Sequence, residues 1–154
     1  NSTNSKRTNF LWCRFRKFCN GKKVEAMATG YYKPSPELEE CNRLIEAYWN
    51  TKQYDKCFDG HLVLAKQGYP LAECQVGYFY LKGLGVCQDF EQAFYWTQRS
   101  AQHGDRDAQC NLASFYEDGI GTQRDMQQAK YWYAQAALQN QEIALQKQKE
   151  LENI

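Results

Sequence analysis

The sequence predicts an all-α protein made of helical hairpins that repeat along the chain. Two observations support this fold class. The sequence matches itself at an offset of 36 residues, and within each repeated unit small and apolar residues recur at helical spacing on both sides of a Gly-x-Gly turn. About three hairpins fit into the 154 residues, with one further helix at the C-terminal end.

The repeat is clearest between the segments that begin at Ala72 and Ala108. Alanine, glycine, aspartate and the large aromatic residues recur at the same places in both segments, which chance does not produce at a single offset. The identical pairs include Ala72/Ala108, Cys74/Cys110, Tyr80/Tyr116, Gly83/Gly119, Gly85/Gly121, Asp89/Asp125, Ala93/Ala129, Trp96/Trp132 and Ala101/Ala137.

Each unit is predicted to fold as a helix, a tight turn and a second helix. Gly83 and Gly85 permit the positive φ needed to leave the first helix, and Asp89 is expected to cap the start of the second. Ala93 allows the two helices to approach closely, and Trp96 fills the space beside it. The corresponding residues of the next unit are Gly119, Gly121, Asp125, Ala129 and Trp132.

A degenerate first unit is predicted upstream, where the match requires a turn shorter by four residues and Gly-x-Gly is missing. Ser35 followed by Pro36 is typical of a helix start, because serine caps the helix and proline suits its first position. We expect helices near residues 36–50 and 53–67. The whole chain then divides into a basic aromatic segment (1–35), the degenerate unit (36–71), two regular units (72–107 and 108–143) and a capping helix (144–154).

Overall composition is typical of a soluble globular protein, with 43% hydrophobic residues, 24% charged residues and a net charge of +1. No stretch reaches the roughly 18 apolar residues of a membrane-spanning helix. The chain starts without Met and without an apolar signal region, so Asn1 is expected to mark a processed or truncated start.

The charge is divided unevenly, with +7 over residues 1–34 and −6 over the remainder. In the N-terminal run FLWCRFRKFCNGKK, aromatic residues alternate with Arg and Lys, a mixture found on both lipid-binding and nucleic-acid-binding surfaces. Three interpretations stay open. The segment caps the first repeat, which we favour, or it sits on an anionic membrane beside a removed anchor, or it contacts a protein or a nucleic acid.

Cysteine usage gives no sign of a metal site. The seven cysteines are odd in number and include no CxxC spacing, so zinc binding is not expected. Most are expected to pack in the core as small apolar residues, although Cys13 and Cys19 could pair in an oxidising compartment.

Catalytic signatures are also missing from the sequence. There is no HExxH, no Ser-centred elbow and no P-loop, and the Gly-x-Gly turns follow a helix rather than a strand. His61 and His103 lie in separate units, and neither can be assigned as a catalytic base. We therefore expect no enzyme, no metal and no cofactor.

The residues shared by the two regular units form the pattern A-x3-[LV]-[GA]-x2-Y-x2-G-x-G-x3-D-x3-A-x2-W-x4-A, which resembles the Sel-one-like repeat (SLR) family, relatives of tetratricopeptide repeats. The resemblance is close over residues 72–141 and loose over 36–71. Cys87 and Gln123 in the turns, and Asn140 in place of the usual glycine, depart from the pattern.

The resemblance implies a right-handed superhelix whose concave trough holds a protein partner. Many members are bacterial and exported to the envelope, and small members include immunity proteins that block secreted toxins such as phospholipase effectors of type VI secretion. The expectation is a non-catalytic scaffold, most concretely an immunity protein in the periplasm or envelope. An envelope-associated adaptor or regulatory protein is the alternative function, and the cytoplasm is the alternative location. No nucleic-acid partner is expected, and membrane contact is expected only through the N-terminal segment.

A binding surface can be proposed from the first helix of each unit. On a helical wheel, Gln75, Tyr78 and Lys82 gather on a side away from the packing residues, and their counterparts differ in character from unit to unit. Such variation over a constant framework suits recognition of one partner, whereas a solvated face without a partner is the alternative. The candidate partner-binding residues, here called the predicted stripe, are Arg43, Glu46, Asn50, Gln75, Tyr78, Lys82, Asn111, Ser114 and Asp118.

Overall fold

A computed structural model describes residues 33–153, and the regular structure in this part of the chain is helical throughout, which confirms the predicted fold class. The interpretations of residues 1–32, including a pairing of Cys13 with Cys19, lie outside the described residues. The elements are α4 (Pro36–Leu44), the π-helix η2 (Ile45–Trp49), α5 (Tyr54–Lys66), α6 (Pro70–Lys82), α7 (Phe90–Gln102), α8 (Arg106–Asp118), α9 (Met126–Leu138) and α10 (Glu142–Glu152).

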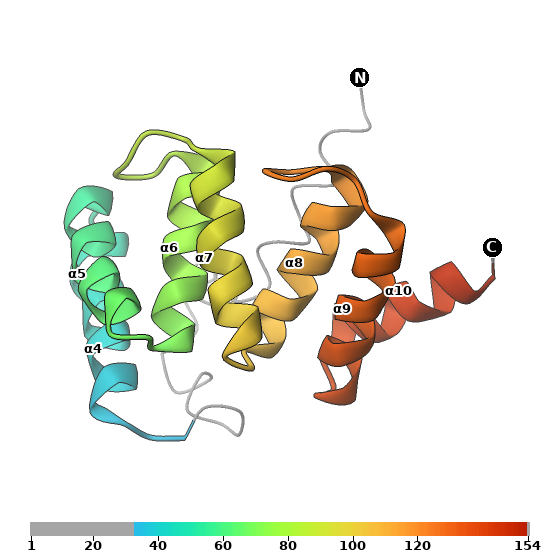
Figure 1. The fold of residues 1–154 in the computed structure, drawn as a ribbon. Coiled ribbons are helices and arrows are strands. Elements are labelled where there is room, and N and C mark those ends of the chain that lie inside the picture. The colour runs from blue at the N-terminus through green and yellow to red at the C-terminus, as the bar shows by residue number, and fades with distance from the viewer. Residues whose placement is uncertain (1–32, 154) are drawn as a thin grey trace.

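The helices form consecutive antiparallel hairpins that lie side by side in chain order, from α4 and α5 at one end to α10 at the other (Figure 1). Each helix contacts the next one along the chain. The turns inside the hairpins α6–α7 and α8–α9 lie at one edge of the array, and the connections between hairpins lie at the opposite edge (Figure 1). We call the second of these the connection edge, and the first helices α4, α6, α8 and α10 all begin there.

The two regular hairpins end and begin their helices as predicted. α6 ends at Gly83 and α8 at Gly119, both in the left-handed conformation with φ of 66° and 68°. The Asp89 carboxylate accepts a first-turn N–H of α7 at 3.0 Å, and the Asp125 carboxylate accepts two first-turn N–H groups of α9. These caps satisfy backbone donors that have no partner within the helix, and they place negative charge at the positive end of the helix dipole.

The second glycine of each turn has a role that its conformation alone does not show. Gly85 lies against the backbone of Tyr54 at the start of α5, and Gly121 lies against the backbone of Phe90 at the start of α7. A Cβ atom at either position would overlap that backbone. Each turn therefore packs on the second helix of the preceding hairpin, which joins successive units.

Left-handed residues also occur at every connection between hairpins. Gly68 and Gly104 have φ of 87° and 92°, and Asn140 adopts a φ of 58° at the corresponding place. Asparagine is one of the few residues other than glycine that adopts this conformation readily. The asparagine that departs from the repeat pattern thus keeps the left-handed turn that glycine provides elsewhere.

The first hairpin begins as predicted and then deviates. The Ser35 hydroxyl accepts the N–H of Leu38 at 3.1 Å and Pro36 occupies the first turn of α4. The chain then widens into the π-helix η2, at whose end the ring of Trp49 lies 5.0 Å from that of Tyr54. A π-turn accommodates an extra residue within a helix, so η2 changes which side chains reach the core.

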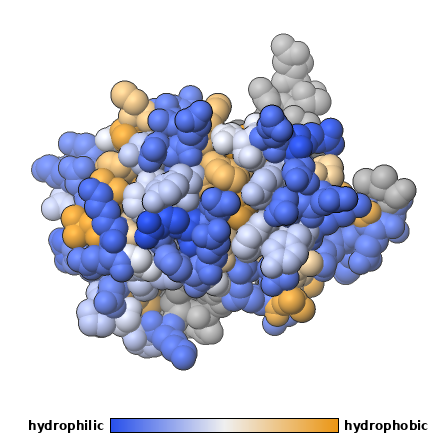
Figure 2. Space-filling view, in the orientation of Figure 1, coloured by the Kyte–Doolittle hydropathy of each residue, from blue (hydrophilic) through white to orange (hydrophobic). Residues whose placement is uncertain are grey.

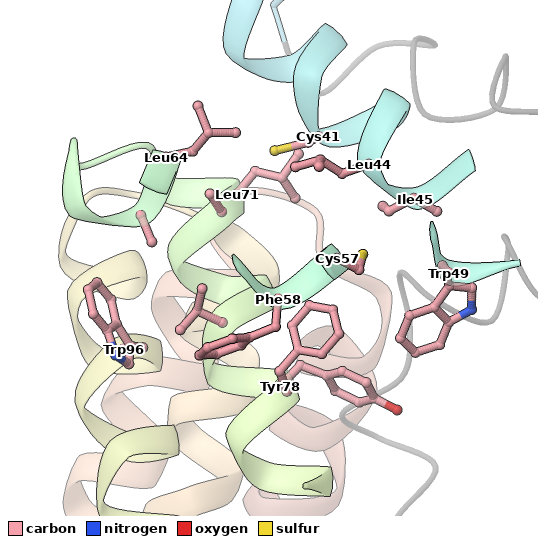
Figure 3. Packing of buried hydrophobic residues seen from close by; sticks show 14 of the residues in the cluster. Cys41, Leu44, Ile45, Trp49, Cys57, Phe58, Leu64, Leu71, Tyr78 and Trp96 are labelled. Atoms are coloured by element: carbon pink, nitrogen blue, oxygen red, sulfur yellow. The ribbon is translucent and has the colours of Figure 1, made fainter. Parts of the chain in front are cut away.

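The largest cluster of buried apolar residues joins this first hairpin to α6 and α7. Figure 3 shows Trp49, Phe58 and Tyr78 converging from η2, α5 and α6. The Phe79 ring lies 5.9 Å from the rings of both Trp49 and Phe58. Although its sequence is degenerate, the first hairpin supplies a large share of the core.

The face seen in Figure 2 is mostly hydrophilic, with scattered hydrophobic side chains. Among the described residues, the largest exposed apolar side chains lie mainly on the second helices, as with Val63, Phe90 and Tyr131. Scattered apolar residues of this kind are ordinary on protein surfaces. Over residues 33–153 we find no helix with the length and apolar character needed to cross a bilayer.

Candidate functional site

The predicted stripe lies on or beside the first helices of the hairpins, along α4 and η2, then α6, then α8. Six of its members reach the surface in full or in part and together offer cationic, anionic and amide groups. These six are Arg43, Glu46, Asn50 and Asp118, which are exposed, and Lys82 and Asn111, which are half-buried. A mixed polar surface of this kind suits selective protein recognition, because complementary charges on a partner suppress wrong pairings.

The prediction that the whole stripe is free is wrong for three members. Gln75, Tyr78 and Ser114 are only 2%, 4% and 7% exposed. The Tyr78 ring lies 6.4 Å from that of Trp49, and Ser114 hydrogen-bonds the Tyr133 hydroxyl. Ten of the 13 residues of α6 are buried, because this helix contacts α4, α5 and α7. Its solvent-accessible side is therefore much narrower than that of a helix packed on one face, which is what the helical wheel assumed.

The charges along the stripe are partly fixed by their neighbours. The Arg43 guanidinium donates two hydrogen bonds to the Glu40 carboxylate, at 2.8 and 2.6 Å, and these bonds hold the pKa of Glu40 below its usual range. At the end of α6, burial lowers the pKa of Lys82, because desolvation disfavours the ammonium form. The Arg43 guanidinium is therefore held in a defined orientation at one end of the surface.

A cluster that the sequence analysis missed lies at the connection edge. The fully buried Glu73 carboxylate accepts Nε of Arg99 at 2.9 Å and pairs with Nδ1 of His103 at 2.5 Å. The Arg99 guanidinium also lies over the Trp96 ring, 5.4 Å from its centroid. A buried carboxylate is tolerated here because both of its oxygens are engaged. The cluster fixes the orientation of the His103 ring.

This cluster borders a pocket of about 600 Å³ at the connection edge. The pocket lies where α4, α6 and α8 begin, and His103 belongs to both the cluster and the pocket wall. Its polar lining includes Lys33, Ser35, Glu37, Tyr69, His103 and Asp105.

A second cluster of polar side chains links the last helix, α10, to the hairpin α8–α9. The Glu117 carboxylate accepts the Tyr133 hydroxyl at 2.6 Å and the Lys147 ammonium at 3.1 Å, which links α8, α9 and α10. Burial, together with the adjacent carboxylate, raises the pKa of Tyr133 far above its usual range, so the hydroxyl stays a donor. These contacts hold α10 against the preceding hairpin.

His61 is a core residue rather than a site residue. It is fully buried, and its Nδ1 lies 2.7 Å from the Cys57 carbonyl oxygen. Burial lowers the pKa of His61 to about 4 and raises the pKa of the Cys57 thiol to about 12, so both stay neutral near pH 7. Of the described cysteines, Cys41, Cys57, Cys74 and Cys110 are buried as expected, and Cys87 is exposed. Within residues 33–153, no three His, Cys, Asp or Glu side chains gather in the way that a metal site requires.

Repeated hairpins with left-handed glycine turns and aspartate caps define this protein as a helical-repeat protein. The Sel1 repeat model matches residues 70–105 and 106–141, which are the hairpins α6–α7 and α8–α9. The crystal structure of a Sel1 repeat protein from Oxalobacter formigenes is similar, with a TM-score of 0.66 and 32% identity over 74% of this chain and 86% of that one. The chain therefore belongs to the Sel1 repeat family, whose repeats generally mediate protein–protein interactions and are generally non-catalytic.

A second similar structure is that of a protective antigen from uropathogenic Escherichia coli with an SLR fold. The TM-score is 0.64 and the identity 26%, over 70% of this chain and 23% of the antigen, so the present chain spans less than a quarter of that protein. No curated protein matches the sequence. The family units start at residues 70 and 106, where α6 and α8 begin, two residues before the unit boundaries expected from the sequence.

Proposed function

We propose that this protein binds one protein partner on the accessible members of the predicted stripe, and that the partner is a secreted toxin which the binding neutralises. The observation that carries the proposal is a contrast between framework and surface. Lys82 and Asp118 occupy equivalent places in the two regular hairpins and carry opposite charges, whereas the glycine and aspartate positions that shape the two turns are identical. Charge that varies over a constant framework favours recognition of a partner without internal symmetry.

The size of the array supports a dedicated blocker over a large assembly platform. Three hairpins and one further helix offer a single short surface, enough for one partner. We propose the bacterial periplasm or envelope as the location, because the two solved structures described above are bacterial and one of those proteins is described as a protective antigen. Cytoplasmic action is the alternative location.

An envelope-associated adaptor is the second candidate function, and the charge of +7 over residues 1–34 favours it. A basic segment of this kind is attracted to anionic lipid, so the repeats would organise other proteins at a membrane. This candidate predicts binding to anionic vesicles that is lost when residues 1–30 are deleted, together with a partner whose activity survives in the complex.

The test is affinity capture from the source organism, followed by identification of the partner and an assay of its activity alone and in the complex. The stripe variant carries Glu46→Arg and Asp118→Arg. A matched control carries Asp59→Arg and Glu91→Arg, the same charge change at exposed positions on the second helices α5 and α7. We expect a 1:1 complex that abolishes the partner's enzymatic activity, retained by the control and lost by the stripe variant.

Either other outcome identifies which part of the proposal fails. A partner that binds both variants equally would show that recognition does not use the stripe. A partner that keeps its full activity in the complex would replace neutralisation by the adaptor function.

A further inference from the structure

Charge is divided unevenly between the two sets of helices in the array. The first helices, which are α4 with η2, α6, α8 and α10, carry 11 acidic and five basic residues, a net charge of −6. The second helices, α5, α7 and α9, carry three acidic and four basic residues, a net charge of +1. Stacking of the hairpins places the first helices side by side, and we call the surface that they form the first-helix face. The negative charge of the array is therefore concentrated on this face.

Most of this negative charge is accessible to a ligand. Of the 11 acidic side chains only Glu73 is buried, and its carboxylate is balanced by Arg99. Exposed carboxylates extend along the whole array, with Glu46 on η2, Asp118 on α8 and Glu150 on α10. Because complementary charge favours association, a ligand that fits this distribution carries basic groups over a comparable length.

The middle of the three hairpins adds a hydrogen-bond donor that lacks an acceptor. Gln75 of α6 is only 2% exposed, and its Nε2 has no hydrogen-bond partner among the residues that the structure describes. The equivalent residues of the neighbouring hairpins do have partners, since Arg43 donates to Glu40 and Nδ2 of Asn111 lies 3.9 Å from Sγ of Cys74. A buried amide without a partner is unusual in proteins. A main-chain carbonyl of a segment that crosses α6 is the kind of acceptor that Gln75 lacks.

We propose that the first-helix face binds the N-terminal segment of its own chain, residues 1–32. This segment carries seven basic residues and one acidic residue, a net charge of +6 that complements the charge of the face. It ends directly before Lys33, and α4, the first helix of the face, begins at Pro36. A chain of this length spans at most about 100 Å, whereas packed helices lie about 10 Å apart, so the segment can reach every helix of the face.

The covalent connection makes weak contacts sufficient. A single exposed ion pair contributes little, but a segment joined to its binding face has an effective concentration in the millimolar range. Glu46 and Asp118 belong to both the first-helix face and the predicted stripe, so an external partner that uses the stripe has to displace the segment. Only this consequence rests on the proposed function, because the contact itself lies within one chain.

The test is carbodiimide cross-linking of the full chain at low salt, followed by mass spectrometry of the linked peptides. This reagent joins a lysine to a carboxylate that it contacts, and the segment contains Lys6, Lys17, Lys22 and Lys23. We expect these lysines to be linked to Asp118 about five times as often as to Asp59, because only Asp118 lies on the first-helix face. Both carboxylates are exposed, and Asp59 lies in the hairpin to which the segment is joined, so the connection alone would favour Asp59. At about 1 M salt, where charges are screened beyond about 3 Å, the links to Asp118 should be lost.

Trypsin digestion of the full chain gives a second measurement with matched variants. Cleavage at the lysines and arginines of residues 1–32 should be about tenfold slower in the full chain than in a synthetic peptide of the same sequence. Glu46→Gln with Asp118→Asn should speed this cleavage about threefold, because two attractive charges are removed. Asp59→Asn with Glu91→Gln, the same change at exposed positions on second helices, is the control and should leave the rate unchanged. Circular dichroism checks that both variants fold.

Four results would overturn the proposal. Two of them are equal linking of Asp118 and Asp59, and cleavage of the segment as fast in the full chain as in the peptide. The third is linking mainly between molecules, seen as a dimer on a denaturing gel, which would assign the face to a second copy of the chain. The fourth is protection from trypsin only when anionic vesicles are added, which would assign the segment to a membrane. No external partner enters these experiments, so their outcome does not depend on the proposed function.

Discussion

The hairpins α6–α7 and α8–α9 have the same backbone arrangement, but different polar groups join their two helices. In the first, the Glu73 carboxylate pairs with His103 at 2.5 Å. In the second, the amides of Gln109 and Gln139, at equivalent positions, hydrogen-bond at 2.8 Å. The aromatic pair on the second helix is nearly unchanged, with ring centroids 5.2 Å apart at 82° in α7 and 5.1 Å apart at 81° in α9.

The difference separates what the fold requires from what it tolerates. The second glycine of each turn is held by a positive φ and by close contact with the previous hairpin, so no other residue fits there without strain. The polar pair between the two helices can differ between hairpins as long as each polar group has a hydrogen-bond partner. A fully hydrogen-bonded pair is tolerated in the protein interior whether it is charged or neutral. The charged pair in α6–α7 and the amide pair in α8–α9 are therefore two equivalent ways to join the helices of a hairpin.

The largest expected effect comes from disrupting a contact that both hairpins share, the contact of the second turn glycine with the preceding hairpin. Gly121→Ala places a methyl group against the backbone of Phe90 at a φ of 68°, and we expect the free energy of unfolding to fall by about 3–4 kcal/mol. Urea denaturation measures it. Gly104→Ala is the control, because φ there is 92° but no atom lies within 4 Å, so only about 1 kcal/mol should be lost. Equal losses at the two positions would show that the contact between hairpins is not limiting.

The comparison extends to the first hairpin through the position occupied by His61, Thr97 and Tyr133 in successive second helices. Only the histidine titrates in mild acid. Its pKa is lowered to about 4 from 6.5, so its contribution to stability is complete above pH 6.5 and is lost as the pH falls towards 4. The expected loss is about 3 kcal/mol at most.

Urea unfolding of the wild type and of His61→Gln across that pH range checks this prediction. The free energy of unfolding of the variant should fall less steeply with decreasing pH. Parallel curves for the two proteins would mean that His61 does not contribute to acid sensitivity.

An intermediate effect is expected when part of the charged cluster of the hairpin α6–α7 is introduced into the hairpin α8–α9. Gln109→Glu puts a nearly buried carboxylate into the second hairpin, where Gln135 replaces the arginine that balances Glu73. We expect a loss of about 2 kcal/mol near pH 7, and the triple variant with Gln135→Arg and Gln139→His should recover most of it. Urea denaturation compares the three proteins. A single variant as stable as the wild type would show that the carboxylate does not need its cationic partners.

The smallest expected effect concerns the connection before α10. Asn140→Gly should change the free energy of unfolding by no more than about 0.5 kcal/mol, whereas Asn140→Ala should cost about 1 kcal/mol, because alanine is disfavoured at a φ of 58°. Thermal unfolding with a matched urea series distinguishes them. Similar losses for both variants would point to a role of the asparagine side chain rather than of the backbone.

Features with a local cause could be predicted from the sequence. Gly83 and Asp89 act on backbone atoms within a few residues, so their spacing alone located the turn and the following helix. The helix start at Ser35 was predicted for the same reason.

Features that depend on contacts between helices could not be predicted. Tyr78 falls on the free side of a helical wheel, but Trp49 from another hairpin covers it, because a helix inside an array packs on several sides. The pairing of Glu73 with His103 joins residues 30 apart in sequence. The one signal for it was a glutamate directly after Ala72, among residues expected to pack, which called for a cationic partner.

The π-turn of η2 has a consequence for where a fragment of this protein could be cut. It lies outside the 36-residue period, and the family match begins only at residue 70. A fragment starting there would contain two complete repeats and would still lose the cover that η2 and α5 provide for Leu71 and Phe79, which are both fully buried in the whole array. Apolar side chains uncovered in this way favour aggregation. The first hairpin, which the family match does not include, is therefore the one that covers the apolar residues at this end of the array.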